Sequence, residues 1–350
     1  MKVVTLLLTM ALVLCGSVAS TAKEPILSEK ELASPPPRII RTCCSFGSDM
    51  KVMLLPGVKI NAITSLDLLG PHHYLGHPKE GNGIIYTRKG GFIDMGHLRD
   101  MADWTAYLYT RIQRAQGKGK VIQLLGHEGG PKNLHLNLEK PLSENDVLQL
   151  AGTIAYDLSV WHEIATWFGA SSVPLVPERY SSFSIEDAYS NLLGVTIGMQ
   201  ALKSELSYEE AMTKLIGQTL EQLEVLEREE DIYKAMEDVR GVWWTREKRL
   251  PSRKVLLQRE LQVYPQVRPW LVPGWAMDQE KGSPLVVPRY TEAGEQLDNY
   301  YRLVIRLNHK FPYKRIFPYR KGRRISQMDF PVLINQIAYE LRTQKRLSMN

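Results

Sequence analysis

The sequence lacks spaced cysteine pairs and long apolar runs. Only three of its 350 residues are cysteine, and Cys43 and Cys44 are the two that lie outside the apolar N-terminal stretch. Two adjacent thiols without a CxxC pair or a second cluster do not form a structural zinc site. After the N-terminal stretch no segment reaches 18 consecutive apolar residues, so we expect no transmembrane helix in the mature protein.

A strong excess of one charge and the signatures of nucleic-acid-binding modules are also missing. The formal net charge is only +6, and 44% of the residues are hydrophobic and 23% charged, which is typical of a globular protein. No RNP, zinc-finger or helix-turn-helix pattern occurs, so we expect no specific binding to nucleic acid. The chain is long enough to bury a sizeable core.

The N-terminal segment is typical of an export signal. Residues 1–22 combine one positive residue, an apolar run and a small-residue end, which is the pattern of a secretory signal peptide, and we expect a periplasmic protein. Cys15 suggests a lipid anchor in the outer membrane, but the bulky Leu14 before it disfavours one. Residues 23–38 are predicted as an extended leader that ends in three prolines, and residues 39–350 as one compact domain.

The adjacent cysteines can be interpreted in several ways if the protein is exported to an oxidising compartment. Cys43 and Cys44 would form a strained vicinal disulfide, remain as two thiols of which one is reactive, or pack as small apolar side chains. The sequence does not choose among these alternatives.

The order of helix-like and strand-like segments predicts an α+β fold, with a predominantly helical core and a small antiparallel sheet from two hairpins. Residues 83–97 and 121–138 each have the pattern of two strands around a glycine-containing turn. Apolar periodicity and capping boxes predict helices over 98–115 and 143–169, from Ser184, from Ser207 and over 330–346, and alternation predicts a strand over 300–307.

The segment from Ser143 to Gly169 is the clearest of these helices. Its apolar residues recur at spacings of three and four, and His162 falls inside the apolar stripe, so its imidazole is predicted to point toward the core. Glu163 points about 100° further round, to the edge of the stripe. The pair is either part of a site or a core histidine that has found a carbonyl partner.

His97 lies where the first hairpin leads directly into a helix. Asp94, Arg99, Asp100 and Asp103 surround it in the sequence. A histidine beside several carboxylates is what a general base, or a metal ligand supported by carboxylates, requires. The structural alternative is that acids in a first helical turn complement the helix dipole.

Two further clusters carry less specific signals. His72, His73 and His77 share a loop and could hold a metal or be surface residues, since no acid or cysteine lies among them. The segment from His309 to Arg324 contains seven Lys and Arg residues with four aromatic ones interleaved. Such a segment suits an anionic envelope polymer or a lipid surface, and is otherwise a solvated loop.

Four short blocks together resemble one known family. They are RTCCSFG at 41–47, GFIDMGHLRD at 91–100, WHEIATW at 161–167 and EDAYSN at 186–191. In combination they resemble the DUF4056 proteins, an exported bacterial family of unknown function. The resemblance implies a Gram-negative envelope setting and supplies no reaction.

The familiar catalytic motifs are incomplete. HEIAT at 162–166 resembles the zincin motif HExxH, but Thr166 stands where the second histidine ligand would be. Neither a GxSxG elbow nor a phosphate-cradling glycine loop occurs.

The first functional hypothesis is an exported hydrolase or lyase that acts on a cell-envelope component. His97, Asp100, His162 and Glu163 are its candidate catalytic residues. A divalent metal, the expected cofactor if there is one, has His97, Asp94, His162 and Glu163 as candidate ligands.

Two other hypotheses compete with it. One is a non-catalytic binding or scaffold protein of the envelope. The other is a thiol hydrolase or acyltransferase with Cys43 or Cys44 as nucleophile, His97 as base and Asp100 as the orienting carboxylate.

Overall fold

The structure, a computed structural model, describes residues 26–37, 40–41, 46–47, 63–171, 178–246, 255–276 and 282–349. Its helices are α1 (Glu29–Leu32), α2 (Met95–Ala115), α3 (Glu144–Trp167), α4 (Asp187–Lys203), α5 (Tyr208–Gln222), α6 (Glu229–Asp238), α7 (Tyr313–Ile316) and α8 (Phe330–Met349). Its strands are β1 (Ile84–Thr87), β2 (Gly91–Asp94), β3 (Gly119–His127), β4 (Pro131–Leu138), β5 (Trp244–Thr245), β6 (Val255–Leu256), β7 (Gln266–Val267), β8 (Leu285–Val286), β9 (Tyr301–Arg306) and β10 (Arg324–Ile325). The predicted α+β class with a helical core is confirmed. Within the described ranges, none of the helices has the length and apolar character needed to cross a membrane.

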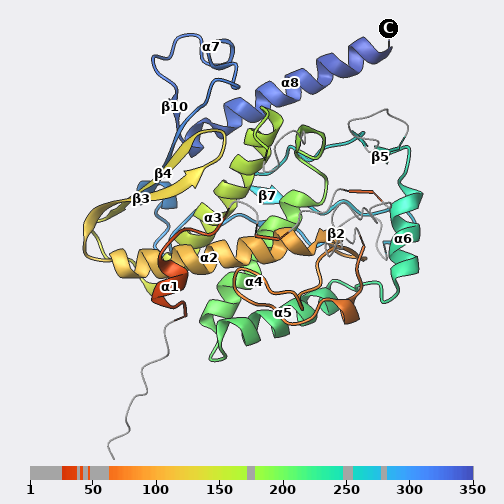
Figure 1. Ribbon diagram of the computed structural model, residues 1–350, viewed down its shortest axis with the longest axis horizontal. Helices are drawn as coiled ribbons and strands as arrows, with labels where there is room; N and C mark the ends of the chain where they lie inside the picture. The colour runs from red at the N-terminus through yellow and green to blue at the C-terminus, as the bar shows by residue number, and fades with distance from the viewer. Residues whose placement is uncertain are drawn as a thin grey trace, which may run out of the picture.

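The helical core is built around α3, with α2 and α4 packed together beside it (Figure 1). Ser143 caps α3 as predicted, its hydroxyl accepting a hydrogen bond from the amide of Asp146. Nearly all of the helix after this first turn is buried, so it has no solvent-facing side. In α4, a Cβ at Gly194 would overlap the carbonyl oxygen of Leu98 in α2, so the close approach of these two helices requires glycine there.

The sheets are all antiparallel, and the two predicted hairpins lie in different ones. The first hairpin forms the two-stranded sheet β1–β2, while the second, β3–β4, continues into a four-stranded sheet of order β10-β9-β4-β3. The strand predicted near residues 300–307 is the one that extends it, because β9 pairs with β4. Figure 1 shows this sheet and α8 on one side of α2, with α4 and α5 on the other.

Two helix starts differ from the sequence predictions. Helix α2 begins at Met95 rather than near residue 98, because the Asp94 side chain accepts hydrogen bonds from the amides of Gly96 and His97 and caps the helix earlier. His97 therefore lies in the first helical turn. Helix α4 begins after Glu186, and the Ser184 hydroxyl donates to the Glu186 carboxylate instead of capping the helix.

The leader and the central helix also differ in detail. The leader was expected to be extended, but α1 forms within it because Ser28 and Glu31 make a complete capping box, and Leu27 and Leu32 are buried. On α3, Glu163 is more deeply buried than His162, the reverse of the order that one apolar stripe predicts. The reason is that α3 is covered on all sides, so a single stripe does not define its inward face.

Candidate metal centre

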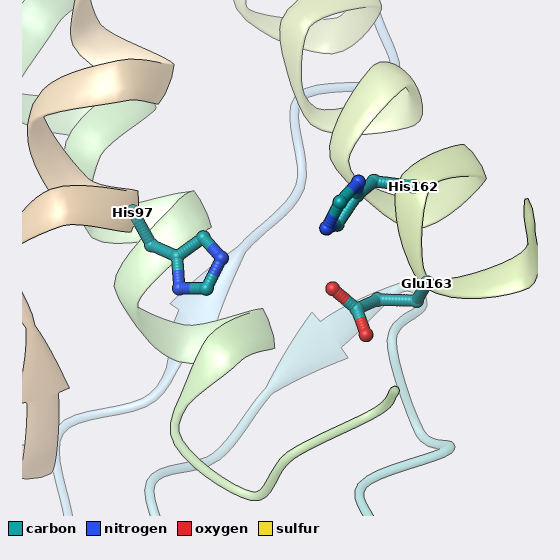
Figure 2. A group of neighbouring side chains, drawn as sticks. All are labelled: His97, His162 and Glu163. Carbon is teal, nitrogen blue, oxygen red and sulfur yellow. The ribbon is translucent and has the colours of Figure 1, made fainter. Parts of the chain in front are cut away.

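Three predicted residues converge from two helices. His97 projects from the first turn of α2, and His162 and Glu163 project from the last turns of α3 toward it (Figure 2). One ligand atom from each of the three side chains lies within 4.8 Å of the other two. The two imidazole rings have centroids 6.4 Å apart. The structure therefore joins two residue groups that are more than sixty positions apart in the sequence.

Each imidazole has a carboxylate close to its Nδ1, hydrogen-bonded at His162 and in ion-pair range at His97. His97 Nδ1 lies 3.0 Å from Asp187 Oδ1 and 3.6 Å from Asp94 Oδ2. His162 Nδ1 lies 2.8 Å from Glu128 Oε1. The hydrogen bond to Glu128 fixes the orientation of the His162 ring and leaves Nε2 for a ligand, which is the usual arrangement around a metal-binding histidine. Asp187 lies beside His97 Nδ1 as a negative charge.

The third member, Glu163, is a buried carboxylate. Its oxygen accepts a hydrogen bond from the backbone amide of Phe183, which fixes the side chain. Burial, and next the neighbouring charge of Asp187, raise the pKa of Glu163 to about 7, although His162 and His97 act in the opposite direction. A carboxylate in this position is suited to a cation that compensates its charge.

Further buried carboxylates surround the cluster. Asp94, Glu186 and Asp187 are all at most 4% exposed. Burial and the charge of Asp187 raise the pKa of Glu186 well above its ordinary value. Arg259 is close enough to interact with Glu163 and Asp187, but burial is the largest influence on its own pKa and lowers it to about 10. The buried acids around the centre include Glu163, Asp94, Glu186 and Asp187, and Arg259 interacts with two of them, an arrangement that favours an additional cation.

A cavity of about 30 Å³ adjoins the two imidazoles. Its walls are formed by Arg41, His97, Asp100, Met101, Trp104, Glu128, Lys132, Leu158, Ser159, His162 and Asn191. This volume is about that of one water molecule. The buried Asn191 Oδ1 has no hydrogen-bond partner among the described residues, so the wall offers an acceptor to a small polar ligand.

The comparison with protein families gives one match. The family model described as "Protein of unknown function (DUF4056)" matches residues 31–273, well over half of the chain. The chain belongs to the DUF4056 family. The matched range contains every residue of the candidate metal centre and both orienting carboxylates. Neither the curated proteins nor the solved structures gave a match to this DUF4056 protein.

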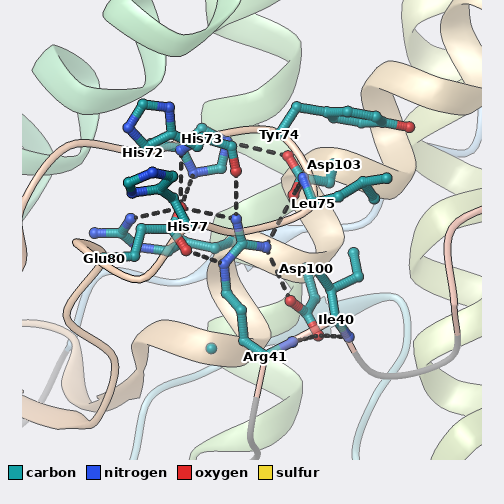
Figure 3. A network of polar contacts seen from close by, with 12 residues as sticks. Ile40, Arg41, His72, His73, Tyr74, Leu75, His77, Glu80, Asp100 and Asp103 are labelled. Atoms are coloured by element: carbon teal, nitrogen blue, oxygen red, sulfur yellow. Dashed lines mark hydrogen bonds and ion pairs between the residues drawn. The ribbon is translucent and has the colours of Figure 1, made fainter. Parts of the chain in front are cut away.

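Asp100, a predicted catalytic residue, belongs to a different network in this DUF4056 protein (Figure 3). One of its oxygens accepts from Arg41 Nη1 at 3.0 Å, and the other accepts from the amide of Ile40 at 3.1 Å. Arg41 also donates to Glu80 and Asp103. Asp100 therefore lines the cavity but uses its oxygens to hold the N-terminal segment rather than to orient His97.

The other predicted clusters lie apart from the centre or have different contacts. His72 is fully buried between Asp103, 3.0 Å from its Nε2, and Glu80, 3.6 Å from its Nδ1. His73 pairs with Glu209 at 3.0 Å, and its ring centroid lies 4.6 Å from that of His77, with the two rings tilted by 45°. These contacts account for the histidine loop without a metal.

The cysteines and the basic segment contribute no residue to this centre in the described part of the chain. Cys43 and Cys44 lie outside the described residues. In the segment 309–324, Phe311, Tyr313 and Phe317 are buried, so three of its four aromatic rings belong to the core rather than to a stacking surface.

Sequence reasoning missed the roles of Glu128 and Asp187. Glu128 lies in the GHEGG turn, where a Cβ at Gly130 would overlap the carbonyl oxygen of Arg306 and one at Gly129 would come within 2.9 Å of the Trp161 ring. The glycines thus let the turn lie against α3 and bring Glu128 to His162. The signal available in the sequence was one acid among glycines next to a histidine; nothing in it identified His162 as the partner.

Proposed function

We propose that this DUF4056 protein is an exported, metal-dependent hydrolase of a cell-envelope component, with the metal bound by His97, His162 and Glu163. The observation that carries the proposal is the convergence of these three side chains beside a cavity, with a carboxylate at Nδ1 of each imidazole. Export and the envelope setting rest on the signal-like residues 1–22.

Two histidines and one glutamate are a ligand set suited to zinc. Catalytic zinc sites use three protein ligands and keep a fourth position for water, and two histidines with one carboxylate are among the sets they use. The three ligand atoms are close enough for small side-chain rotations to bring them onto one ion. The buried acids Asp94 and Asp187 add negative charge, which favours a divalent ion further.

The proposed chemistry depends on the fourth coordination position, which the three protein ligands would leave for water. A bound zinc ion would lower the pKa of a water molecule to about 7, which supplies a nucleophile at neutral pH. The adjoining cavity has room for that water, and the Asn191 Oδ1 atom in its wall can accept a hydrogen bond from it. Asp187 and Glu128 act as positioning residues, because each contacts an imidazole rather than the reacting atoms.

The test is zinc binding by the purified protein and by single-residue variants, measured by metal analysis and by calorimetric titration after chelation. We expect about one zinc per chain, and its loss in His97→Ala, His162→Ala and Glu163→Gln. Asp187→Asn should weaken zinc binding by about 10- to 100-fold, because it loosens His97 without removing a ligand. The matched control is His73→Ala, which removes a carboxylate-paired histidine outside the centre and should leave zinc binding unchanged.

The same proteins decide whether the centre is catalytic. Cell-wall sacculi and simple ester substrates incubated with zinc-loaded protein should be hydrolysed, and the His97→Ala protein should be inactive. If the unmodified protein binds no zinc, or if His97→Ala and His162→Ala bind it as well, the metal centre is wrong. Zinc binding without any hydrolysis would instead support the non-catalytic binding protein.

A further inference from the structure

The four-stranded sheet has one face toward the core and one toward solvent. Leu134, Leu136, Leu303 and Ile305 point inward and are almost completely buried. Side chains alternate between the two faces along a strand, so their sequence neighbours point outward. The strand register therefore defines the composition of the outer face.

The outer face carries a row of arginines. Arg302 is paired with His135 across β9 and β4, and Arg306 is paired with Arg324 across β9 and β10. All three arginines are exposed, and none forms an ion pair with a carboxylate within the described part of the chain. Like charges directly opposite each other on neighbouring strands are unfavourable in an isolated sheet. A negatively charged partner would remove this cost.

Acidic residues are missing from the same strands. None of β3, β4, β9 or β10 contains Asp or Glu. At the far end of the face Lys120 does lie 3.6 Å from Glu139, which follows β4, so the positive charge is concentrated on the three arginines. A positive face whose strands contain no acid is complementary to an anionic surface.

Exposed aliphatic side chains lie on the same face, on β3, with β4 between them and the arginines. Ile122 and Leu124 in β3 are 62% and 69% exposed. By register Ile122 lies next to His135, and Leu124 lies next to Asn133, whose other neighbour is Val304. Exposed apolar side chains that adjoin basic ones are typical of surfaces that enter the lipid headgroup region.

We propose that this outer face of the β10-β9-β4-β3 sheet docks on an anionic lipid surface. The arginines bind headgroup phosphates, and Ile122 and Leu124 enter the boundary between headgroups and acyl chains. An anionic polysaccharide would use the arginines but would leave the two aliphatic side chains in water, which is why the combination favours lipid. The loop between β9 and β10 adds exposed Lys314 and Lys321 and a fully exposed Tyr319 to this part of the chain.

The test is cosedimentation of the purified protein with vesicles of phosphatidylethanolamine and phosphatidylglycerol, with vesicles of phosphatidylcholine alone as the neutral comparison. We expect binding to the anionic vesicles only, weakened by added salt. Each arginine near an anionic surface contributes about fivefold to partitioning, so Arg302→Gln/Arg306→Gln/Arg324→Gln should lower it about 100-fold. Ile122→Ser/Leu124→Ser should also lower it, at unchanged charge.

The matched control removes the same charge elsewhere. Lys214→Gln/Arg228→Gln/Lys234→Gln changes three exposed basic residues on or next to α5 and α6 and should leave vesicle binding within about twofold of the unmodified protein. Unchanged thermal melting would show that each variant is folded. Absence of binding to anionic vesicles, or an equal loss in the control, would overturn the proposal. So would binding to dextran sulfate that depends on the arginines and not on Ile122 and Leu124, because it would identify an anionic polymer as the partner.

Discussion

Single residues show that histidine–carboxylate contacts serve two purposes in this protein. His97 and His162 each have a carboxylate at Nδ1 and line a cavity, so Nε2 can reach a ligand. His72 instead hydrogen-bonds Asp103 through Nε2, has Glu80 3.6 Å from Nδ1 and is almost completely buried, so neither of its nitrogens faces a cavity. The surroundings of the imidazole therefore distinguish a candidate ligand such as His162, which lines a cavity, from a structural histidine such as His72, which has a carboxylate near each ring nitrogen.

The network around Arg41 gives a pH dependence of stability that one residue controls. Burial raises the pKa of Asp100 from the ordinary 3.8 to about 6, and the nearby Arg41 only partly offsets this. The folded protein therefore holds this proton more tightly than the unfolded chain. The stability contributed by protonated Asp100 is fully present below about pH 4 and is lost as the pH rises through about 6.

Asp100→Asn should remove this loss because the amide does not ionise. Relative to the unmodified protein, the free energy of unfolding of Asp100→Asn should rise by up to about 3 kcal/mol between pH 4 and pH 7. Urea unfolding at several pH values measures it. Burial also opposes ionisation of Glu80 and Asp103, but contacts with Arg41, and for Asp103 also with His72, lower the pKa of each overall. Their stabilising contributions begin to fall below about pH 5, and they are present in both proteins, so they cancel in the difference between Asp100→Asn and the unmodified protein.

A control for the Asp100 measurement is an exposed acid outside the network. Asp67→Asn removes a carboxylate on the surface and should run parallel to the unmodified protein over the same pH range. A difference between Asp100→Asn and the unmodified protein that does not change with pH would mean that Asp100 is already ionised at pH 4 in the folded state.

At the scale of elements, the approach of α2 to α4 positions His97 against Asp187. Gly194→Ala places a methyl group on the Leu98 carbonyl oxygen, so the two helices must separate, and we expect the free energy of unfolding to fall by about 1–3 kcal/mol. Because Leu98 follows His97, zinc binding should weaken as well. Thermal and urea unfolding measure the first effect, and calorimetric titration the second.

A second helical glycine supplies the comparison for Gly194. A Cβ added at Gly217 in α5 would meet no atom within 4 Å, so Gly217→Ala should raise the free energy of unfolding by about 0.5–1 kcal/mol through helix propensity alone. Destabilisation of both variants by the same amount would show that close helix packing is not what glycine provides at Gly194.

The elements themselves were largely predictable, whereas their partners were not. Apolar periodicity and side-chain caps are local, and they located α3 from Ser143, α5 from Ser207 and the two hairpins. The pairing of β9 with β4 joins strands more than 160 residues apart, and no local pattern encodes it. The same distinction holds for the candidate metal centre. The local density of polar groups identified His97 and the pair His162 and Glu163 on α3, but tertiary packing places Asp187 and Glu128 against the two imidazoles.

At the scale of the whole molecule, the family match ends before several elements that complete the fold. It covers residues 31–273, whereas β9, β10 and α8 all lie beyond it. The Trp161 ring stacks with those of Phe311 and Phe330, whose centroids are 5.6 and 5.8 Å away. Because Trp161 precedes His162, this C-terminal region supports the turn of α3 that carries the candidate metal centre.

Truncation after residue 273 should therefore abolish cooperative folding. It removes β9 from the middle of the sheet and α8 from its packing on α3, along with fully buried side chains such as Leu303, Ile305, Phe330, Leu333 and Ile337. Each such side chain contributes about 1.5–3 kcal/mol, so these five together contribute about 10 kcal/mol, as much as the net stability of a typical domain. Near-ultraviolet circular dichroism, thermal melting and zinc titration of the truncated chain measure the loss. The control is truncation after residue 344, which leaves these contacts intact; this protein should melt like the full chain. If the chain truncated after residue 273 still unfolds cooperatively and binds zinc, residues 31–273 fold as an independent unit and the C-terminal region only adds to it.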